Sequence, residues 1–123
     1  MKIRITTMMF GLVISLIGAT HVHAEQQKWQ VVTGGWKAEF VLQIDGGGNV
    51  SGVSNWTNGP QGDAMSGKVS DSKIELVRDL GDGKSTQTFT GTYQDDRSKA
   101  TGKVNGTGVS NQSWSTTSIV SSP

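Results

Sequence analysis

The sequence has no cysteine, and its only two histidines, His21 and His23, lie near the N-terminus. Beyond residue 24 this absence excludes disulfides, thiol nucleophiles, Ser-His-Asp triads and the usual ligands of structural zinc. Carboxylates are present, but Glu39 and Glu75 alternate with apolar residues and belong to a polar face. The other carboxylates considered fall in expected turns, where aspartate accepts backbone N–H bonds: Asp45, Asp63, Asp71, Asp79, Asp82, Asp95 and Asp96. We therefore expect no catalytic residue, metal or cofactor, and no enzyme.

Long apolar runs are also scarce, and the one clear example is "MMFGLVISLIGA" at residues 8–19. Lys2 and Arg4 precede it, and "VHA" ending at Ala24 follows it as a small-residue cleavage signal. The run is too short to span a membrane, so the pattern predicts a secretory signal peptide over residues 1–24. We expect no membrane span and a secreted protein, periplasmic or extracellular, of bacterial type.

The chain carries no strong charge of either sign. Lys2 and Arg4 belong to the expected signal peptide, which leaves nine basic against ten acidic residues and a net charge of −1. This balance does not indicate nucleic acid or a polybasic membrane-binding patch as a partner. Residues 25–123 have the length of one domain, whose stability must come from burial and backbone hydrogen bonds.

Helical periodicity is absent after residue 24, and short alternating runs rich in Val, Ile, Thr and aromatic residues take its place. Glycine, aspartate, asparagine and serine separate these runs, mostly in segments short enough for hairpins. We predict strands over residues 28–33, 38–44, 49–56, 64–69, 73–79, 86–94, 99–105 and 112–120. Eight strands joined by hairpins predict an all-β, antiparallel, up-and-down barrel.

Glycines occupy the middle of several predicted strands, at Gly52, Gly67, Gly91 and Gly102. Their alternation places each of them on the apolar face, between apolar neighbours. Glycine weakens a strand interior but allows the strong coiling that a small closed sheet requires. The pattern favours a closed barrel, which also removes the exposed strand edges of an open sheet.

The order of these motifs resembles the small secreted bacterial lipocalin-like, or calycin, domains. An early Trp29, the hairpin "DGGGNVSG" at residues 45–52, the strand glycines and a late Trp114 carry the resemblance across residues 25–123. The outline is also similar to the streptavidin family, in "GGW", "VSGVS" and "STQTFTGTY". The residues of that family's biotin site are mostly not matched, because Phe89 and Val104 stand where tryptophans are expected. The resemblance implies a barrel without a biotin site.

Large aromatic side chains are numerous for so small a domain, and two interpretations stay open. They either fill the barrel interior, or some of them line a cavity, because eight-stranded barrels lie at the size limit between the two. If a cavity is present, we expect it to be lined by residues from several strands: Trp36, Trp56, Arg78, Tyr93 and Trp114. Trp56 precedes the segment "TNGPQGD", which suggests a position at the barrel mouth.

Arg78 shares the parity of Ile74 and Leu76 and is expected inward or at the barrel rim. The calycin resemblance implies an arginine packed over the early tryptophan, a cation–π contact that closes one end. That role falls to Arg78 on Trp29 or Trp36, unless Arg78 leans into solvent.

Two functions follow from these alternatives. The first is a non-catalytic binding protein that holds a small, largely apolar ligand at the open end of the barrel. The second is a protein-interaction barrel, such as an inhibitor of a protease or lysozyme, that acts through its loops. The segment "NGPQGD" at residues 58–63, expected to be long and exposed, would then form the contact.

Overall fold

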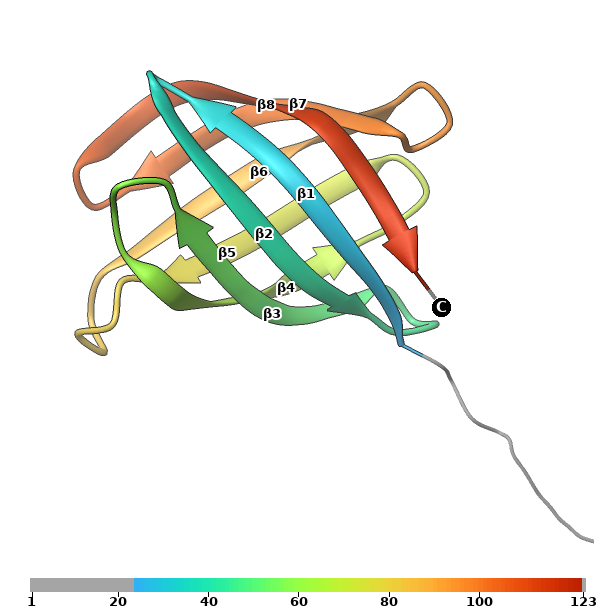
Figure 1. The fold of residues 1–123 in the computed structure, drawn as a ribbon, viewed down its shortest axis with the longest axis horizontal. Helices are drawn as coiled ribbons and strands as arrows, with labels where there is room; N and C mark the ends of the chain where they lie inside the picture. The colour runs from blue at the N-terminus through green and yellow to red at the C-terminus, as the bar shows by residue number, and fades with distance from the viewer. Residues whose placement is uncertain (1–23, 123) are drawn as a thin grey trace, which may run out of the picture.

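The computed structural model describes residues 24–122, which form a single closed sheet (Figure 1). Each strand pairs antiparallel with the next, and β1 pairs with β8 to close the barrel. The strands are β1 (Glu25–Thr33), β2 (Trp36–Ile44), β3 (Asn49–Trp56), β4 (Gln61–Val69), β5 (Lys73–Asp79), β6 (Thr86–Gln94), β7 (Lys99–Gly106) and β8 (Val109–Ser122). In the described part of the chain there is no helix long and apolar enough to cross a membrane.

The predicted eight-stranded up-and-down barrel is confirmed, and its architecture is compatible with a calycin-like fold. Several strands extend beyond their predicted limits: β4 starts at residue 61 and β8 at residue 109. The residues added at the start of β4 and of β8 directly follow glycine-containing segments, which the alternation pattern assigns to turns. The expected signal peptide lies outside the described residues, apart from Ala24.

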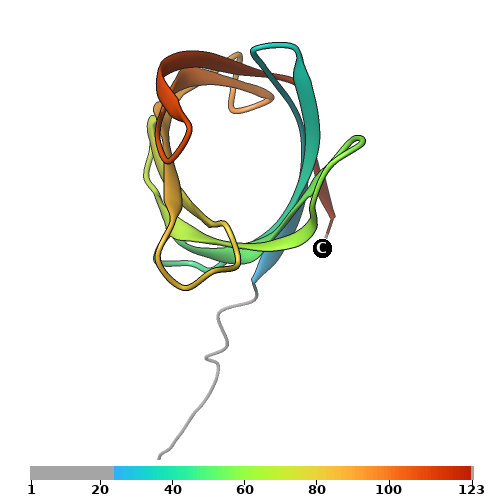
Figure 2. The same ribbon diagram turned by 90° about the vertical axis from the view of Figure 1, so that its left-hand side faces the viewer.

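The turns of a meander alternate between the two ends of the barrel (Figure 1). One end, called here the cavity end, carries the turns at residues 34–35, 57–60, 80–85 and 107–108. The opposite, terminal end carries the start of β1, the end of β8 and the turns at residues 45–48, 70–72 and 95–98. Figure 2 looks at the molecule from the cavity end.

The middle of the barrel is filled by side chains. Phe40, Leu42, Leu76 and Phe89 are each no more than 1% exposed, as the inward face of the alternation predicts. A series of aromatic contacts runs between the two ends, with ring centroids 5.3–6.4 Å apart: Tyr93, Trp29, Trp114, Phe89, Phe40 and Trp56. Burial of these rings supplies a large part of the stability of a domain without disulfides.

The mid-strand glycines point inward, as predicted, and they allow neighbouring strands to approach closely. Gly91 of β6 faces Gly102 of β7 across the ladder. A Cβ atom on Gly102 would overlap the carbonyl oxygen of Thr90, and one on Gly67 would overlap that of Glu75. Glycine is therefore required for the strong coiling of this small barrel.

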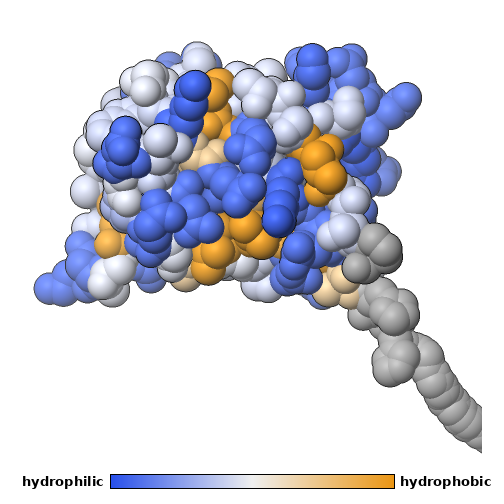
Figure 3. Space-filling view, in the orientation of Figure 1, coloured by the Kyte–Doolittle hydropathy of each residue, from blue (hydrophilic) through white to orange (hydrophobic). Residues whose placement is uncertain are grey.

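The outer surface is mainly polar, with small apolar groups between hydrophilic side chains (Figure 3). Val41 and Val53 are cross-strand neighbours on β2 and β3 and are half-buried on this outer side. Such small groups are common on monomeric proteins.

Candidate ligand-binding site

A cavity of about 280 Å³ opens at the cavity end of the barrel. Its apolar lining comes from Trp36, Trp56, Pro60, Phe89, Val104 and Val109. The polar part of the lining comes from Thr33, Arg78, Gln87 and Gln112, with Gly108 between them. An apolar wall with a few convergent polar groups is typical of small-molecule sites.

The floor of the cavity is Phe89. Its ring packs edge-on against Phe40 at 5.3 Å and against Trp114 at 6.0 Å, measured between ring centroids. These rings fill the barrel directly below the cavity. Both interpretations of the aromatic residues therefore hold in part, because the middle of the barrel is filled and one end is hollow.

Trp36 stands at the rim. It begins β2 directly after the two-residue turn Gly34–Gly35, whose φ angles of +54° and +87° favour glycine. All four tryptophans lie in the described part of the chain, and among them only Trp36 is exposed, at 55%. An exposed indole beside a cavity with a partly apolar lining offers a surface that a ligand can cover.

Trp56 forms a wall together with Arg78. The guanidinium carbon lies 4.5 Å from the centre of the Trp56 ring, a cation–π distance. The Trp56 indole N–H donates to Ser54 Oγ at 3.2 Å, which holds the ring in place. The expected stacking of Arg78 on Trp29 or Trp36 is wrong. Trp29 lies toward the other end of the barrel, and the Arg78 guanidinium packs on Trp56 instead.

Arg78 is buried and paired. Its Nη2 and Nε donate to the same carboxylate oxygen of Asp63, at 2.8 and 3.1 Å, and its Nη1 donates to Gln87 Oε1 at 2.9 Å. The side chains of Arg78 and Asp63 are only 9% and 14% exposed. A buried guanidinium requires such partners because its desolvation is costly.

The position of Asp63 differs from the one predicted from the sequence. We expected a solvated turn residue, but β4 begins at Gln61, so that Asp63 lies inside a strand with the inward parity of Met65. The segment 58–63 is also not a long loop, because the turn comprises residues 57–60 and is closed by backbone bonds, including Trp56 N–H to Pro60 C=O at 2.9 Å.

Two side-chain amides complete the polar lining. Gln87 Nε2 donates to the carbonyl of Thr107 at 2.8 Å, and Gln112 Nε2 donates to Thr33 Oγ1 at 2.8 Å. Both amides are thereby oriented against turns of the cavity end. Gln112 was not among the expected site residues, because it lies in the polar stretch "SNQS", which has no alternation.

Of the five residues that the sequence assigned to the site, three line the cavity and two do not. Trp36, Trp56 and Arg78 meet at the cavity. Trp114 is 2% exposed below the floor, where its indole N–H donates to the carbonyls of Thr90 and Lys103 at 3.1 Å each. Tyr93 precedes the turn at residues 95–98, and therefore lies toward the terminal end. Neither residue lines the cavity.

Tyr93 takes part in closing the terminal end. The Arg97 guanidinium lies 4.3 Å from the centre of its ring, and Trp29 packs edge-on against it at 5.9 Å. Burial raises the pKa of the Tyr93 hydroxyl above its usual value, while Arg97 acts in the opposite direction. The described residues thus have a cation–π contact toward each end of the barrel, Arg78 on Trp56 at the cavity end and Arg97 on Tyr93 at the terminal end.

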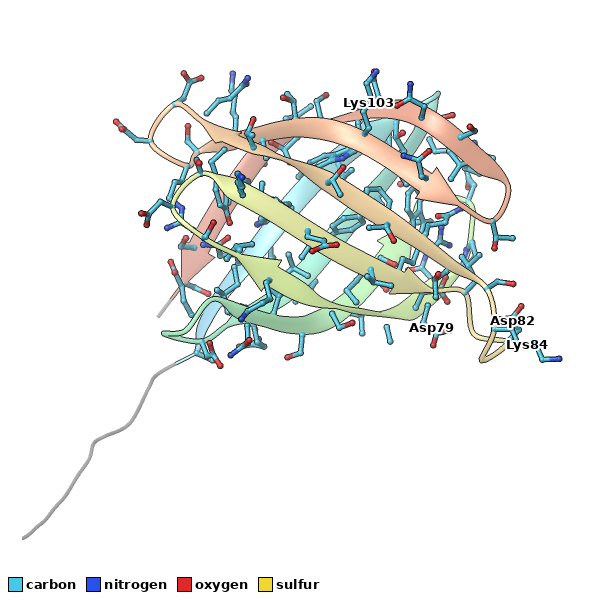
Figure 4. The ribbon with its side chains drawn as sticks, turned by 180° about the vertical axis from the view of Figure 1, so that it is seen from behind. Asp79, Asp82, Lys84 and Lys103 are labelled. Atoms are coloured by element: carbon cyan, nitrogen blue, oxygen red, sulfur yellow. The ribbon has the colours of Figure 1, made fainter. Side chains whose placement is uncertain are left out.

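The aspartates of the β5–β6 turn act as turn caps, as the sequence indicates. Asp82 accepts bonds from the Ser85 hydroxyl and from the backbone N–H groups of Ser85 and Lys84, which lowers its pKa to about 2. Asp79 accepts from the Gly81 N–H at 2.8 Å. Asp82 lies on the turn outside the barrel, and Asp79 lies at the end of β5 next to this turn (Figure 4). Among residues 24–122 no three His, Cys, Asp or Glu side chains are grouped so that they could hold a metal ion.

No protein-family model, no curated protein and no solved structure matches this chain.

Proposed function

We propose that this protein is a secreted, non-catalytic binding protein of calycin type that holds a small, largely apolar ligand at the cavity end of its barrel. The observation that carries the proposal is the cavity of about 280 Å³ with the exposed indole of Trp36 at its rim. The volume lies at the lower limit of known ligand pockets, which fits a compact molecule of one or two rings.

The chemistry of the lining supports binding rather than catalysis. Among the described residues that line the cavity there is no carboxylate, histidine or cysteine, so a general base or nucleophile of the common types is missing. The carboxylate closest in the hydrogen-bond network, Asp63, is engaged by Arg78. Secretion is proposed from the signal-peptide pattern of residues 1–24.

The first test is a calorimetric titration of the purified protein with a panel of one- and two-ring apolar compounds. We expect binding by at least one compound, and Trp36→Ala should weaken it at least about tenfold, as removal of an aromatic hot spot does. Val120→Ala is the matched control, because Val120 is 60% exposed but lies near the end of β8, toward the terminal end. A panel without any binding contradicts the proposal.

The filled middle of the barrel favours a second candidate, in which a protein partner is bound by the turns of the cavity end. Trp36 and the exposed residues of the turn at 57–60 would form that contact. Replacing Thr57, Asn58 and Pro60 would then abolish capture of a partner from the native secretome. Capture that survives this replacement contradicts the second candidate.

A further inference from the structure

The cavity contains one charge that is already balanced. Arg78 is the charged residue among the described residues of the lining, and Asp63 does not line the cavity. Asp63 binds the guanidinium through one carboxylate oxygen at 2.8 and 3.1 Å, on the side where Nε and Nη2 lie. The cavity therefore presents a cationic group whose charge is neutralised from outside the lining.

The hydrogen-bonding groups that this network leaves available to a ligand carry no net charge. A guanidinium has five N–H groups. Within the described part of the chain, two of those of Arg78 donate to Asp63 and one donates to Gln87. The face of the guanidinium lies on Trp56. What the wall offers a ligand is therefore hydrogen bonds from Arg78 and the amides of Gln87 and Gln112, without a net charge to balance.

A charged ligand would lose its hydration in this cavity and find no counter-charge. Burying an ion without a partner is costly, whereas a neutral polar group needs only hydrogen bonds. A carboxylate would also compete with Asp63 for Arg78 and meet its like charge within the same network.

We infer that the ligand is an uncharged ring compound with a hydrogen-bonding group, and that Asp63 is the residue that determines this specificity by neutralising Arg78. The inference rests on the proposed function. Asp63 acts through Arg78 and need not touch the ligand.

The experiment uses three planar probes of nearly identical shape: neutral benzamide, anionic benzoate and cationic benzamidine. Each is titrated into the protein at up to millimolar concentration while the indole N–H signals of Trp36 and Trp56 are followed by NMR. We expect benzamide to bind at least about tenfold more tightly than either ion. Equal or tighter binding of benzoate, or no binding of benzamide by a protein that binds the apolar panel, overturns the inference. Failure of the panel as well overturns the proposed function itself.

Three variants separate charge from shape. Asp63→Asn should shift the preference toward benzoate by about tenfold, because Arg78 loses its counter-charge. Arg78→Gln should shift it toward benzamidine, so the test survives if one variant does not fold. The double variant Asp63→Asn/Arg78→Gln should again prefer benzamide.

Asp96→Asn is the control, since it removes the same charge from an exposed turn at the terminal end. It should leave all three affinities unchanged. If Asp63→Asn and Asp96→Asn change the preference equally, the effect is one of net charge, and the role of Asp63 is wrong.

Discussion

The indole of Trp114 lies over Gly91, with its Cζ2 atom 2.9 Å from the position that a Cβ of residue 91 would occupy. The same indole donates to the carbonyls of Thr90 and Lys103, on the two strands that it crosses. Glycine and tryptophan are therefore complementary at this point. The missing side chain allows both the close approach of β6 and β7 and the seating of the ring that supports the cavity floor.

Gly91→Ala should consequently destabilise the barrel by about 1–3 kcal/mol, the usual cost of overpacking a core. The added methyl group meets the carbonyl of Thr101 as well as the indole, so neither neighbour can yield freely. Chemical denaturation measures the change in free energy of unfolding. Gly47→Ala is the control, because a Cβ there makes only ordinary contacts of 3.4 Å or more, and it should change stability by less than about 0.5 kcal/mol. Equal stability of both variants would contradict the packing described.

Asp63→Ala should cost about 3–5 kcal/mol of stability, because it leaves a buried guanidinium without its counter-charge. The double variant Asp63→Leu/Arg78→Met should lose clearly less, since it removes both charges and keeps apolar volume. Thermal or chemical unfolding of the two proteins compares these costs. A loss below about 1 kcal/mol for Asp63→Ala would be typical of an exposed ion pair and would contradict its burial.

Tyr93 is the only tyrosine of the chain, so its ionisation can be followed directly by the absorbance of tyrosinate. Burial raises its pKa above the usual 10.0, and we expect a titration midpoint above that value. The raised pKa means that the folded state favours the protonated phenol. This contribution to stability is fully present below pH 10.0 and is lost as the pH rises through the folded-state pKa.

Arg97→Ala should move that midpoint further upward, because the positive charge of Arg97 lowers the pKa of Tyr93. A midpoint at or below 10.0 in the unaltered protein would contradict the burial of the hydroxyl. A midpoint that Arg97→Ala leaves in place would contradict the contact between the two side chains.

The fold was predictable because the signals that specify it are local. Alternation places Phe40, Leu42 and Phe89 on one face, and glycine or aspartate marks the turns between the strands. The inward parity of Arg78 followed from the same rule. The early start of β4 was missed because "GPQGD" combines several turn-forming residues, and Asp63 was missed with it.

The partners inside the barrel were not predictable from alternation. Trp56 and Arg78 belong to β3 and β5, which are not neighbours in the sheet, and their contact depends on how the barrel closes. The separation of Tyr93 from the cavity was accessible, however. In a meander the turns alternate between the two ends of the barrel. Tyr93 lies almost directly before the turn at residues 95–98, which belongs to the terminal end, so it cannot lie at the cavity end.

The four tryptophans allow a direct test of whether a ligand occupies the cavity beside Trp36 and Trp56. An NMR titration with the apolar panel resolves their four indole N–H signals in one experiment. We predict that the signals of Trp36 and Trp56 shift in a saturable manner, while that of Trp29, buried toward the terminal end, stays in place. Four signals that remain unmoved throughout the panel, or a shift confined to Trp29, would contradict ligand binding in this cavity.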